Sequence, residues 1–205
     1  MIRLWGRISS INVRKVLWTL QETGVPFERI DAGLAYGVVN DAAYVAKNPN
    51  RLVPLLEDGD FVLWESNAIV RYLCARYAPQ CYPQDLQRRF DAERWMDWQQ
   101  TTLNPAGRDA FVQLIRKPGG QVDAARVDAS VAATTPLLDL LDAHLARQPF
   151  MAGAQLTMAD IPIACEIHRW RGTPLPHQPR PHLDRWYQHM LALPASRGVL
   201  DIVLS

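Results

Sequence analysis

The stretch from residue 52 to residue 70, LVPLLEDGDFVLWESNAIV, decides the fold class of this chain. The segments PLLE and FVLW flank Asp58 and Gly59, a dipeptide that favours a type I′ β-hairpin. From Ser66 to Tyr77 apolar residues recur at helical spacing, so a helix is expected directly after the hairpin.

The preceding residues alternate between strand and helix signals. IRLW (2–5) predicts a strand that ends at Gly6, and FERID (27–31) predicts a second strand. Between them, apolar residues at helical spacing from Val13 onward predict a helix that stops at Gly24. NDAAYVAK (40–47) predicts a short helix. Together with the hairpin, this order predicts a small α/β layer with a mixed sheet.

The second half of the chain contains helix signals only. APQCYPQD (78–85) breaks the pattern, and Leu86, Phe90, Trp95 and Trp98 then predict one long helix. Apolar residues from Val127 to Leu145 predict another, which Pro136 should kink or interrupt. The fold class is therefore α/β plus all-α. We expect an N-terminal domain (1–78), a linker (79–85) and an all-helical domain (86–205).

A helix start is encoded in LTMADI (156–161). Thr157 can cap the amide of Asp160, and the Asp160 carboxylate can reach back to the Thr157 amide. Leu156 and Ile161 stand at the positions of a hydrophobic staple. We interpret Asp160 as a structural capping residue and not as a catalytic one.

Charge and cysteine content exclude several function classes. The 205 residues carry 22 Lys and Arg against 21 Asp and Glu, so a net charge of +1 gives no reason to expect nucleic acid or an anionic membrane as a partner. The three cysteines form no CxxC and no metal-ligand cluster with histidines. We expect no disulfide, no metal and no transmembrane segment or signal peptide, and thus a soluble, cytoplasmic protein.

The order of these segments resembles that of the cytosolic glutathione transferases. The resemblance covers essentially the whole chain and rests on SSINVRKV (9–16), NPNRLVPLLEDGD (48–60), WESNAIVRYL (64–73), MDWQ (96–99) and LTMADI. It points to a bacterial, serine-type or asparagine-assisted member similar to the theta and nu classes. It implies a thioredoxin-like N-terminal domain, a helical C-terminal domain, glutathione as cosubstrate and a homodimer.

The resemblance also implies a binding site for glutathione. Only about one X-Pro bond in twenty is cis, but the family implies a cis Val53-Pro54 bond, which frees the Val53 backbone to pair with the cysteinyl residue of glutathione. A trans proline at a strand edge is the alternative. Ser66 and the helix N-terminus would hold the γ-glutamyl carboxylate, and Glu65 the ammonium group. Alternatively, Ser66 only caps its helix.

The same resemblance places the chemistry at the first strand-to-helix turn. Ser10 falls where serine-type members place a hydroxyl that donates to the thiolate, and Asn12 falls where some bacterial members place an asparagine. Lowering a thiol pKa of about 8.5 by about two units requires roughly 2.7 kcal/mol. A shift in register would exchange Ser10 for Ser9, and both serines could instead only cap the helix.

Two positions depart from the family pattern. Arg51 stands where a glycine is common, and Leu52 stands where a basic residue is common. Arg51 could replace the missing cation at the glycyl carboxylate of glutathione, or it could be a solvated loop residue. Asp97 stands where some members reach the glutathione of the neighbouring subunit, although an aspartate on a helix surface normally faces water.

An apolar electrophile pocket is expected between the first turn and the helical domain. Its candidate residues are Trp98, Arg108, Phe111, Ile115 and Trp170, some of which should instead serve the core. His168 and Arg169 have no assigned role. The leading hypothesis is transfer of the glutathione thiolate to a small apolar electrophile, a detoxification reaction. The alternatives are a glutathione-dependent peroxidase, dehalogenase or isomerase, or a non-catalytic binding module.

Overall fold

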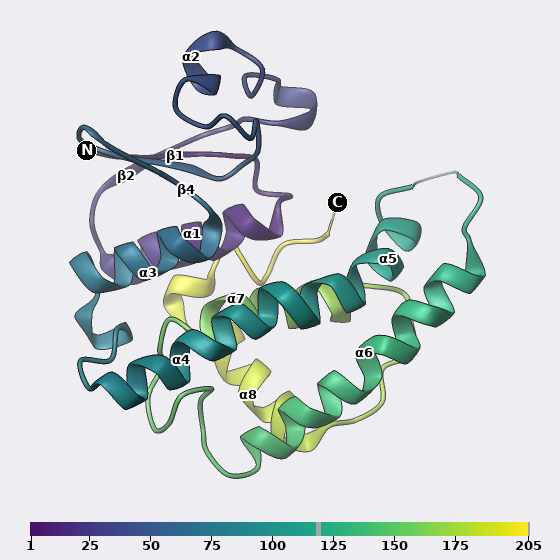
Figure 1. Cartoon of the computed structure of the whole chain (residues 1–205). Coiled ribbons are helices and arrows are strands. Elements are labelled where there is room, and N and C mark those ends of the chain that lie inside the picture. Colours follow the sequence, from purple (N-terminus) through teal and green to yellow (C-terminus); the bar gives the residue numbers. More distant parts are fainter. Residues whose placement is uncertain (118–119, 205) are drawn as a thin grey trace. The chain divides into compact units, whose positions relative to one another are not determined.

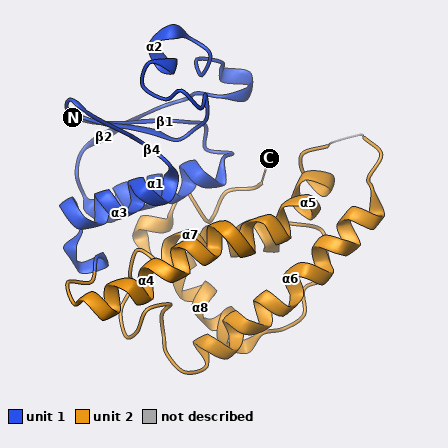
Figure 2. Ribbon diagram, viewed as in Figure 1, with its two compact units in different colours: residues 1–82 blue, residues 83–205 orange. Residues whose placement is uncertain are grey.

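The computed structural model describes residues 1–117 and 120–204 and divides into two compact units (Figures 1 and 2). Unit 1 comprises Met1–Tyr82 and unit 2 comprises Pro83–Ser205. Unit 1 is α/β, and the regular elements described in unit 2 are helices. The predicted class, a mixed α/β layer followed by a helical region, is confirmed.

Unit 1 is built on a four-stranded mixed sheet in the order β2-β1-β3-β4. Strand β1 (Ile2–Trp5) pairs in parallel with β2 (Phe27–Ile30), and this crossover contains helix α1 (Ile11–Thr23). On its other side β1 pairs antiparallel with β3 (Leu55–Asp58), which pairs with β4 (Phe61–Trp64). The expected strands and their mixed pairing are confirmed.

Two helices cover one face of this sheet, and α2 (Ala42–Val45) lies on the other side (Figure 1). Helix α1 packs along α3 (Ser66–Tyr77), and the apolar side chains that predicted them are buried in this contact: Val13, Val16, Leu20, Ile69 and Leu73. Helix α1 ends at Gly24, whose φ of 66° is left-handed, a conformation that glycine adopts without steric cost.

The predicted hairpin is present, but its turn differs from the expected type. Asp58 pairs with Phe61, so the two loop residues are Gly59 and Asp60. Of these only Gly59 has a positive φ, at 61°. A type I′ turn requires positive φ at both loop residues, whereas a glycine at the first position alone meets the requirement of type II′. The expectation of a type I′ turn was therefore wrong.

Unit 2 begins with a long helical run. Helix α4 (Leu86–Trp98) passes through a π-helical turn (Gln99–Leu103) into α5 (Asn104–Leu114). Pro105 follows the wide turn. A proline has no N–H to donate to the carbonyl of the residue four positions earlier, and its ring crowds that carbonyl. The widened turn therefore suits this sequence. It was not foreseen, because the apolar pattern continues across it.

Helix α6 (Ala124–Leu145) runs without a break through Pro136, so the expected interruption does not occur. The Thr135 hydroxyl donates a 2.8 Å hydrogen bond to the Val131 carbonyl within the same helix. Tertiary packing also favours a continuous helix, because Thr134 and Leu138 on either side of the proline are buried. Packing thus outweighs the local preference of proline.

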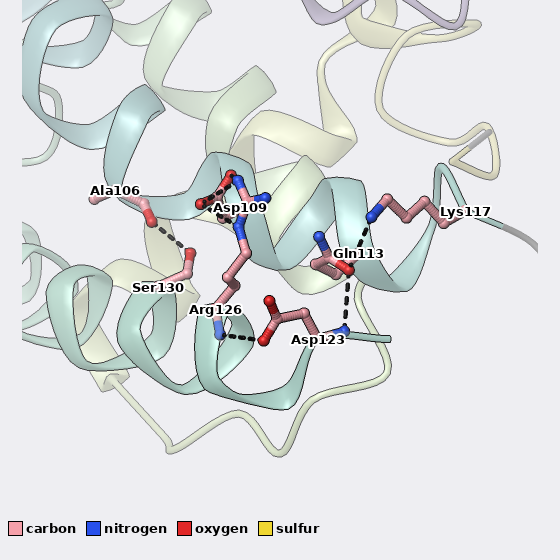
Figure 3. Close-up of polar contacts among 7 residues, drawn as sticks. All are labelled: Ala106, Asp109, Gln113, Lys117, Asp123, Arg126 and Ser130. Carbon is pink, nitrogen blue, oxygen red and sulfur yellow. Dashed lines mark hydrogen bonds and ion pairs between the residues drawn. The ribbon is translucent and has the colours of Figure 1, made fainter. Parts of the chain in front are cut away.

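Polar contacts fix the start of α6 against α5 (Figure 3). Asp123 caps α6 by accepting a 3.2 Å bond from the Arg126 amide, and its own amide donates to Gln113 at 3.1 Å. The Arg126 guanidinium bonds both carboxylate oxygens of Asp109, at 2.9 and 3.2 Å, and Ser130 donates to the Ala106 carbonyl.

The start of α7 (Asp160–Arg171) confirms the structural interpretation of Asp160. Its buried carboxylate accepts 2.9 Å bonds from the amides of Thr157 and Met151 and a 3.0 Å bond from Nε1 of Trp186 on α8 (Pro181–Ala192). One detail differs from the expected capping box, since the Thr157 hydroxyl accepts from the Ala159 amide and not from Asp160. Burial raises the pKa of Asp160 to about 6, although its hydrogen bonds oppose this.

Candidate functional site

Unit 1 contains an open cleft that brings together most of the residues expected to bind glutathione. Its enclosed volume is only about 50 Å³, so it is a groove and not a chamber. It is lined by Asn12, Asn48, Asn50, Leu52, Val53, Pro54, Trp64, Glu65 and Ser66. These residues come from the start of α1, the loop before β3, the end of β4 and the start of α3.

The backbone at Val53 is open. The Val53-Pro54 peptide bond is cis, and within residues 1–117 and 120–204 no group hydrogen bonds to the N–H or C=O of Val53. The preceding residue is held firmly, since the Leu52 carbonyl accepts a 2.7 Å bond from the Tyr44 hydroxyl and a 2.9 Å bond from the Asn48 amide. Val53 therefore presents a free donor and acceptor on a fixed support.

The two side chains that hold the Leu52 carbonyl, Tyr44 and Asn48, are themselves fixed in place. Tyr44 and Asn48 are buried, and burial raises the pKa of Tyr44 to about 12, so its hydroxyl stays protonated and donating near neutral pH. Asn48 also accepts a 3.1 Å bond from the Asn50 amide, the Asx turn that the sequence NPN favours. Sequence reasoning treated NPN only as a turn and missed Tyr44, Asn48, Asn50 and Trp64. The turn pattern was the available signal for the asparagines.

The first turn of α3 closes the other end of the cleft. Glu65 occupies the N-cap position with a φ of 74° and makes no side-chain capping bond. Ser66 is buried as the first helical residue, and no described residue bonds its hydroxyl, so the alternative that Ser66 caps the helix does not hold. The first-turn amides of a helix, its positive dipole end and this hydroxyl together form a site suited to an anion.

The turn between β1 and α1 lies close to Val53. A Cβ atom on Gly6 would come within 3.3 Å of the Val53 Cβ and 2.4 Å of a Val13 methyl, so only glycine fits between them. Ser10 is the N-cap residue of α1, but its hydroxyl makes no capping bond, which argues against a purely capping role. The Oδ1 atom of Asn12 is buried without a partner among the residues that the structure describes.

Two of the candidates in unit 1 do not line the cleft. Ser10 is half-buried beside it, and Arg51 is exposed with a left-handed φ of 56°. Leu52, which stands where the family often has a basic residue, does line the cleft. Asn48 and Asn50 also line the cleft, and their side-chain amides donate within the loop, Asn48 to the Leu52 carbonyl and Asn50 to the Asn48 side chain.

Comparisons with known proteins identify the family. The model of the glutathione S-transferase N-terminal domain matches residues 1–75, and that of the C-terminal domain matches residues 100–194. The chain belongs to the glutathione S-transferase family. It is 46% identical to glutathione S-transferase GstB of Escherichia coli strain K12 over the full length of both, and 32% identical to glutathione S-transferase 3 of Zea mays, covering 95% of this chain and 90% of the relative.

A solved structure of this family supports the fold in detail. The theta class glutathione S-transferase of Xanthomonas axonopodis pv. citri, determined with glutathione bound, superposes with a TM-score of 0.96. It is 43% identical and covers 100% of this chain and 99% of its own. The predicted thioredoxin-like N-terminal domain and helical C-terminal domain of a glutathione S-transferase are thereby confirmed.

Two aromatic candidates for the electrophile pocket of this transferase are packed within unit 2. The Phe111 ring lies beneath the guanidinium groups of Arg116 and Arg169, at 5.2 and 5.3 Å. The buried Trp170 ring lies 3.4 Å from the position of a Cβ on Gly107, where α5 and α7 pack. Both residues thus contribute to the core of unit 2, as aromatic residues at helical spacing often do.

The remaining candidates are dispersed. Arg108 is exposed on α5 and Ile115 is half-buried at its end. Trp98 lines a different cavity of about 360 Å³ between α4 and the end of α6, together with Arg94, Trp95, Leu140, His144 and Arg147. The described cavities therefore do not gather Trp98, Arg108, Phe111 and Trp170 in one place.

The other polar residues considered from the sequence have local partners or face solvent. His168 contacts the Tyr187 hydroxyl at 2.9 Å and the Ile202 carbonyl at 3.0 Å, and Arg169 forms a buried ion pair with Glu166. Asp97 is exposed on α4. These contacts give His168 and Arg169 structural roles in unit 2.

Residues 1–117 and 120–204 contain no group of three or more His, Cys, Asp or Glu side chains suited to a metal ion. Cys74, Cys81 and Cys165 are buried and are not disulfide-bonded. A hydrogen bond with Cys81, reinforced by burial, raises the pKa of Cys74 well above its usual range. In the same residues no helix combines the length and the apolar character needed to cross a membrane.

Proposed function

We propose that this protein binds glutathione in the cleft of unit 1, activates its thiol as a thiolate and transfers it to a small apolar electrophile. The observation that carries the proposal is the open backbone of Val53, which shares one cleft with Glu65 and Ser66. The 43% identical Xanthomonas protein was determined with glutathione bound, which supports the same ligand here.

The cysteinyl and γ-glutamyl parts of glutathione each have a chemically suited partner. The cysteinyl N–H and C=O pair with the Val53 backbone as an added strand would. The γ-glutamyl carboxylate lies at the N-terminus of α3, where the Ser66 hydroxyl and the first-turn amides donate to it. The Glu65 carboxylate accepts from the γ-glutamyl ammonium group. A groove open to solvent suits an extended tripeptide better than an enclosed chamber.

The thiolate is stabilised at the first turn of unit 1. The Ser10 hydroxyl, which caps nothing, donates to the sulfur, and the Asn12 amide group assists. A hydroxyl donor and an amide near the N-terminus of α1 supply preferential stabilisation of the order needed, about 2.7 kcal/mol for two pKa units.

Side chains of unit 2 are the basis for the second substrate and the oligomeric state that we propose. An apolar or aromatic electrophile suits the cavity of unit 2 that the half-buried Trp98 lines, whereas Phe111 and Trp170 are buried in the core and Arg108 is exposed outside this cavity. Leu86 and Phe90 lie one helical turn apart on α4 and are 61% and 63% exposed, which suits burial against a second copy of the chain. We place this homodimer in the cytoplasm, where the glutathione pool is reduced.

Calorimetric titration with glutathione at neutral pH, repeated in two buffers of different ionisation enthalpy, tests the proposal. Binding accompanied by proton release is expected, because the site favours the thiolate. S-methylglutathione, which has no thiol proton, is the control and should bind without proton release. Glutathione binding without proton release would refute thiolate activation, and no binding at all would refute the proposed ligand.

A further inference from the structure

Lys15 is a buried cation in unit 1 to which the proposed chemistry assigns no role. It lies on α1 and is 0% exposed, among the apolar residues that pack α1 against α3. Its Nζ atom is 3.3 Å from Oδ1 of Asn67, which is also buried. Burying an ammonium group is costly unless polar contacts such as this one compensate it.

The Asn67 side chain that Lys15 contacts lies next in sequence to the lining of the binding cleft. Asn67 is the second residue of α3 and directly follows Ser66. Side chains of a helix lean toward its N-terminus, so this contact holds the ammonium beneath the first turn. Standard bond lengths place Nζ within about 7 Å of the Asn67 backbone nitrogen.

We propose that Lys15 is a positioning residue for the γ-glutamyl carboxylate of glutathione: it orients Asn67 and places a buried positive charge beneath the first turn of α3. A positive charge at this end of a helix opposes the helix dipole, so it is unfavourable in the empty protein. With a carboxylate bound on the same turn the interaction becomes favourable, and burial protects it from screening by salt. This inference rests on the proposed function, because it names the group that the cleft of unit 1 recognises.

The test compares two tripeptides within each variant. Glutathione carries the γ-glutamyl carboxylate, and 4-aminobutanoyl-Cys-Gly lacks only that group. The ratio of their dissociation constants measures recognition of the carboxylate, and a general loosening of the cleft affects both ligands and cancels. In Lys15→Met the preference for glutathione should fall by about tenfold, the effect of one poorly screened charge at this distance.

Further variants separate charge from shape. Lys15→Gln keeps a donor for Asn67 without the charge and should lose the same preference, whereas Lys15→Arg should keep it within about twofold. Arg76→Met removes one charge from the exposed last turn of α3, about 15 Å away along the helix, and should leave the ratio unchanged. Thermal unfolding verifies that each variant is folded. If Lys15→Met does not fold, the ratio measured for Lys15→Gln is the test.

The outcomes distinguish this inference from the proposed function. If the wild-type protein binds glutathione and an uncharged variant keeps the full preference for it, the role of Lys15 is refuted and the proposed function stands. If the wild-type protein binds neither tripeptide, both are refuted. If only the preference is lost, with 4-aminobutanoyl-Cys-Gly bound as before, the role of Lys15 is established.

Discussion

The hydroxyl of Tyr44 donates a 2.7 Å hydrogen bond to the carbonyl oxygen of Leu52, eight residues further along the chain. Asn48 donates to the same carbonyl at 2.9 Å. The two bonds fix the residue before Val53 through side chains, so the backbone of Val53 can remain open toward the cleft. The open backbone of Val53 is thus supported by side chains from α2 and from the loop that follows it, and not by sheet pairing.

Replacing Tyr44 by phenylalanine should loosen this support. The Leu52 carbonyl would keep only the bond from Asn48, and the free energy of unfolding should fall by about 1 kcal/mol. Because Val53 is then held less firmly, the dissociation constant of glutathione should rise about fivefold, which is also a change of about 1 kcal/mol. Urea denaturation and calorimetric titration measure the two effects. Tyr36→Phe, at an exposed tyrosine of the same unit, is the control and should change neither.

Replacing Ser10 by alanine should lower kcat/KM by about 100-fold, the usual cost of losing one donor to a developing anion. The pKa of the bound thiol, followed by ultraviolet absorbance of the thiolate, should rise because its hydroxyl donor is gone. Ser10→Thr keeps the hydroxyl and should retain most of the activity. If kcat/KM falls in Ser9→Ala but not in Ser10→Ala, the hydroxyl donor is Ser9.

Sequence reasoning could predict the framework of the fold, because strand and helix periods and the stop at Gly24 are local patterns. The cleft residues Val53, Pro54, Glu65 and Ser66 were expected because of the resemblance to glutathione transferases, not because of any periodicity. The support by Tyr44 depends on a contact across a loop, which no periodicity records. The packing of Phe111 and Trp170 was equally inaccessible, because helical spacing shows that a side chain is buried but not what it is buried against.

Arg51 offers a test of its own, because its φ of 56° is left-handed. A non-glycine residue pays roughly 1–2 kcal/mol there, and glycine avoids this cost but adds entropy to the unfolded chain. Arg51→Gly should therefore raise the free energy of unfolding by about 0.5–1 kcal/mol. Arg51 is exposed and outside the cleft lining, so the affinity for glutathione should change less than about twofold. A clear loss of affinity, also seen in Arg51→Met, would show that it binds the glycyl carboxylate.

Asp160 should make stability depend on pH. Its pKa is about 6 in the folded protein and 3.8 in its ordinary state, so between these values the folded state holds more protons than the unfolded state. The contribution of Asp160 is therefore complete below about pH 4 and is lost as the pH rises through 6, by about 3 kcal/mol for two units. Asp160→Asn cannot ionise, and it places an amide group against three N–H donors, so it should be less stable at every pH.

The difference between wild type and Asp160→Asn isolates this effect, because the other carboxyl groups are common to both proteins. In urea denaturation from about pH 4 to 7 the advantage of the wild type should shrink as the pH rises. Trp186→Phe removes one donor that lowers the pKa of Asp160, so the shrinkage should then continue to higher pH. An advantage that grows with pH would mean that the donors from Met151, Thr157 and Trp186 outweigh burial and that Asp160 is ionised well below pH 6.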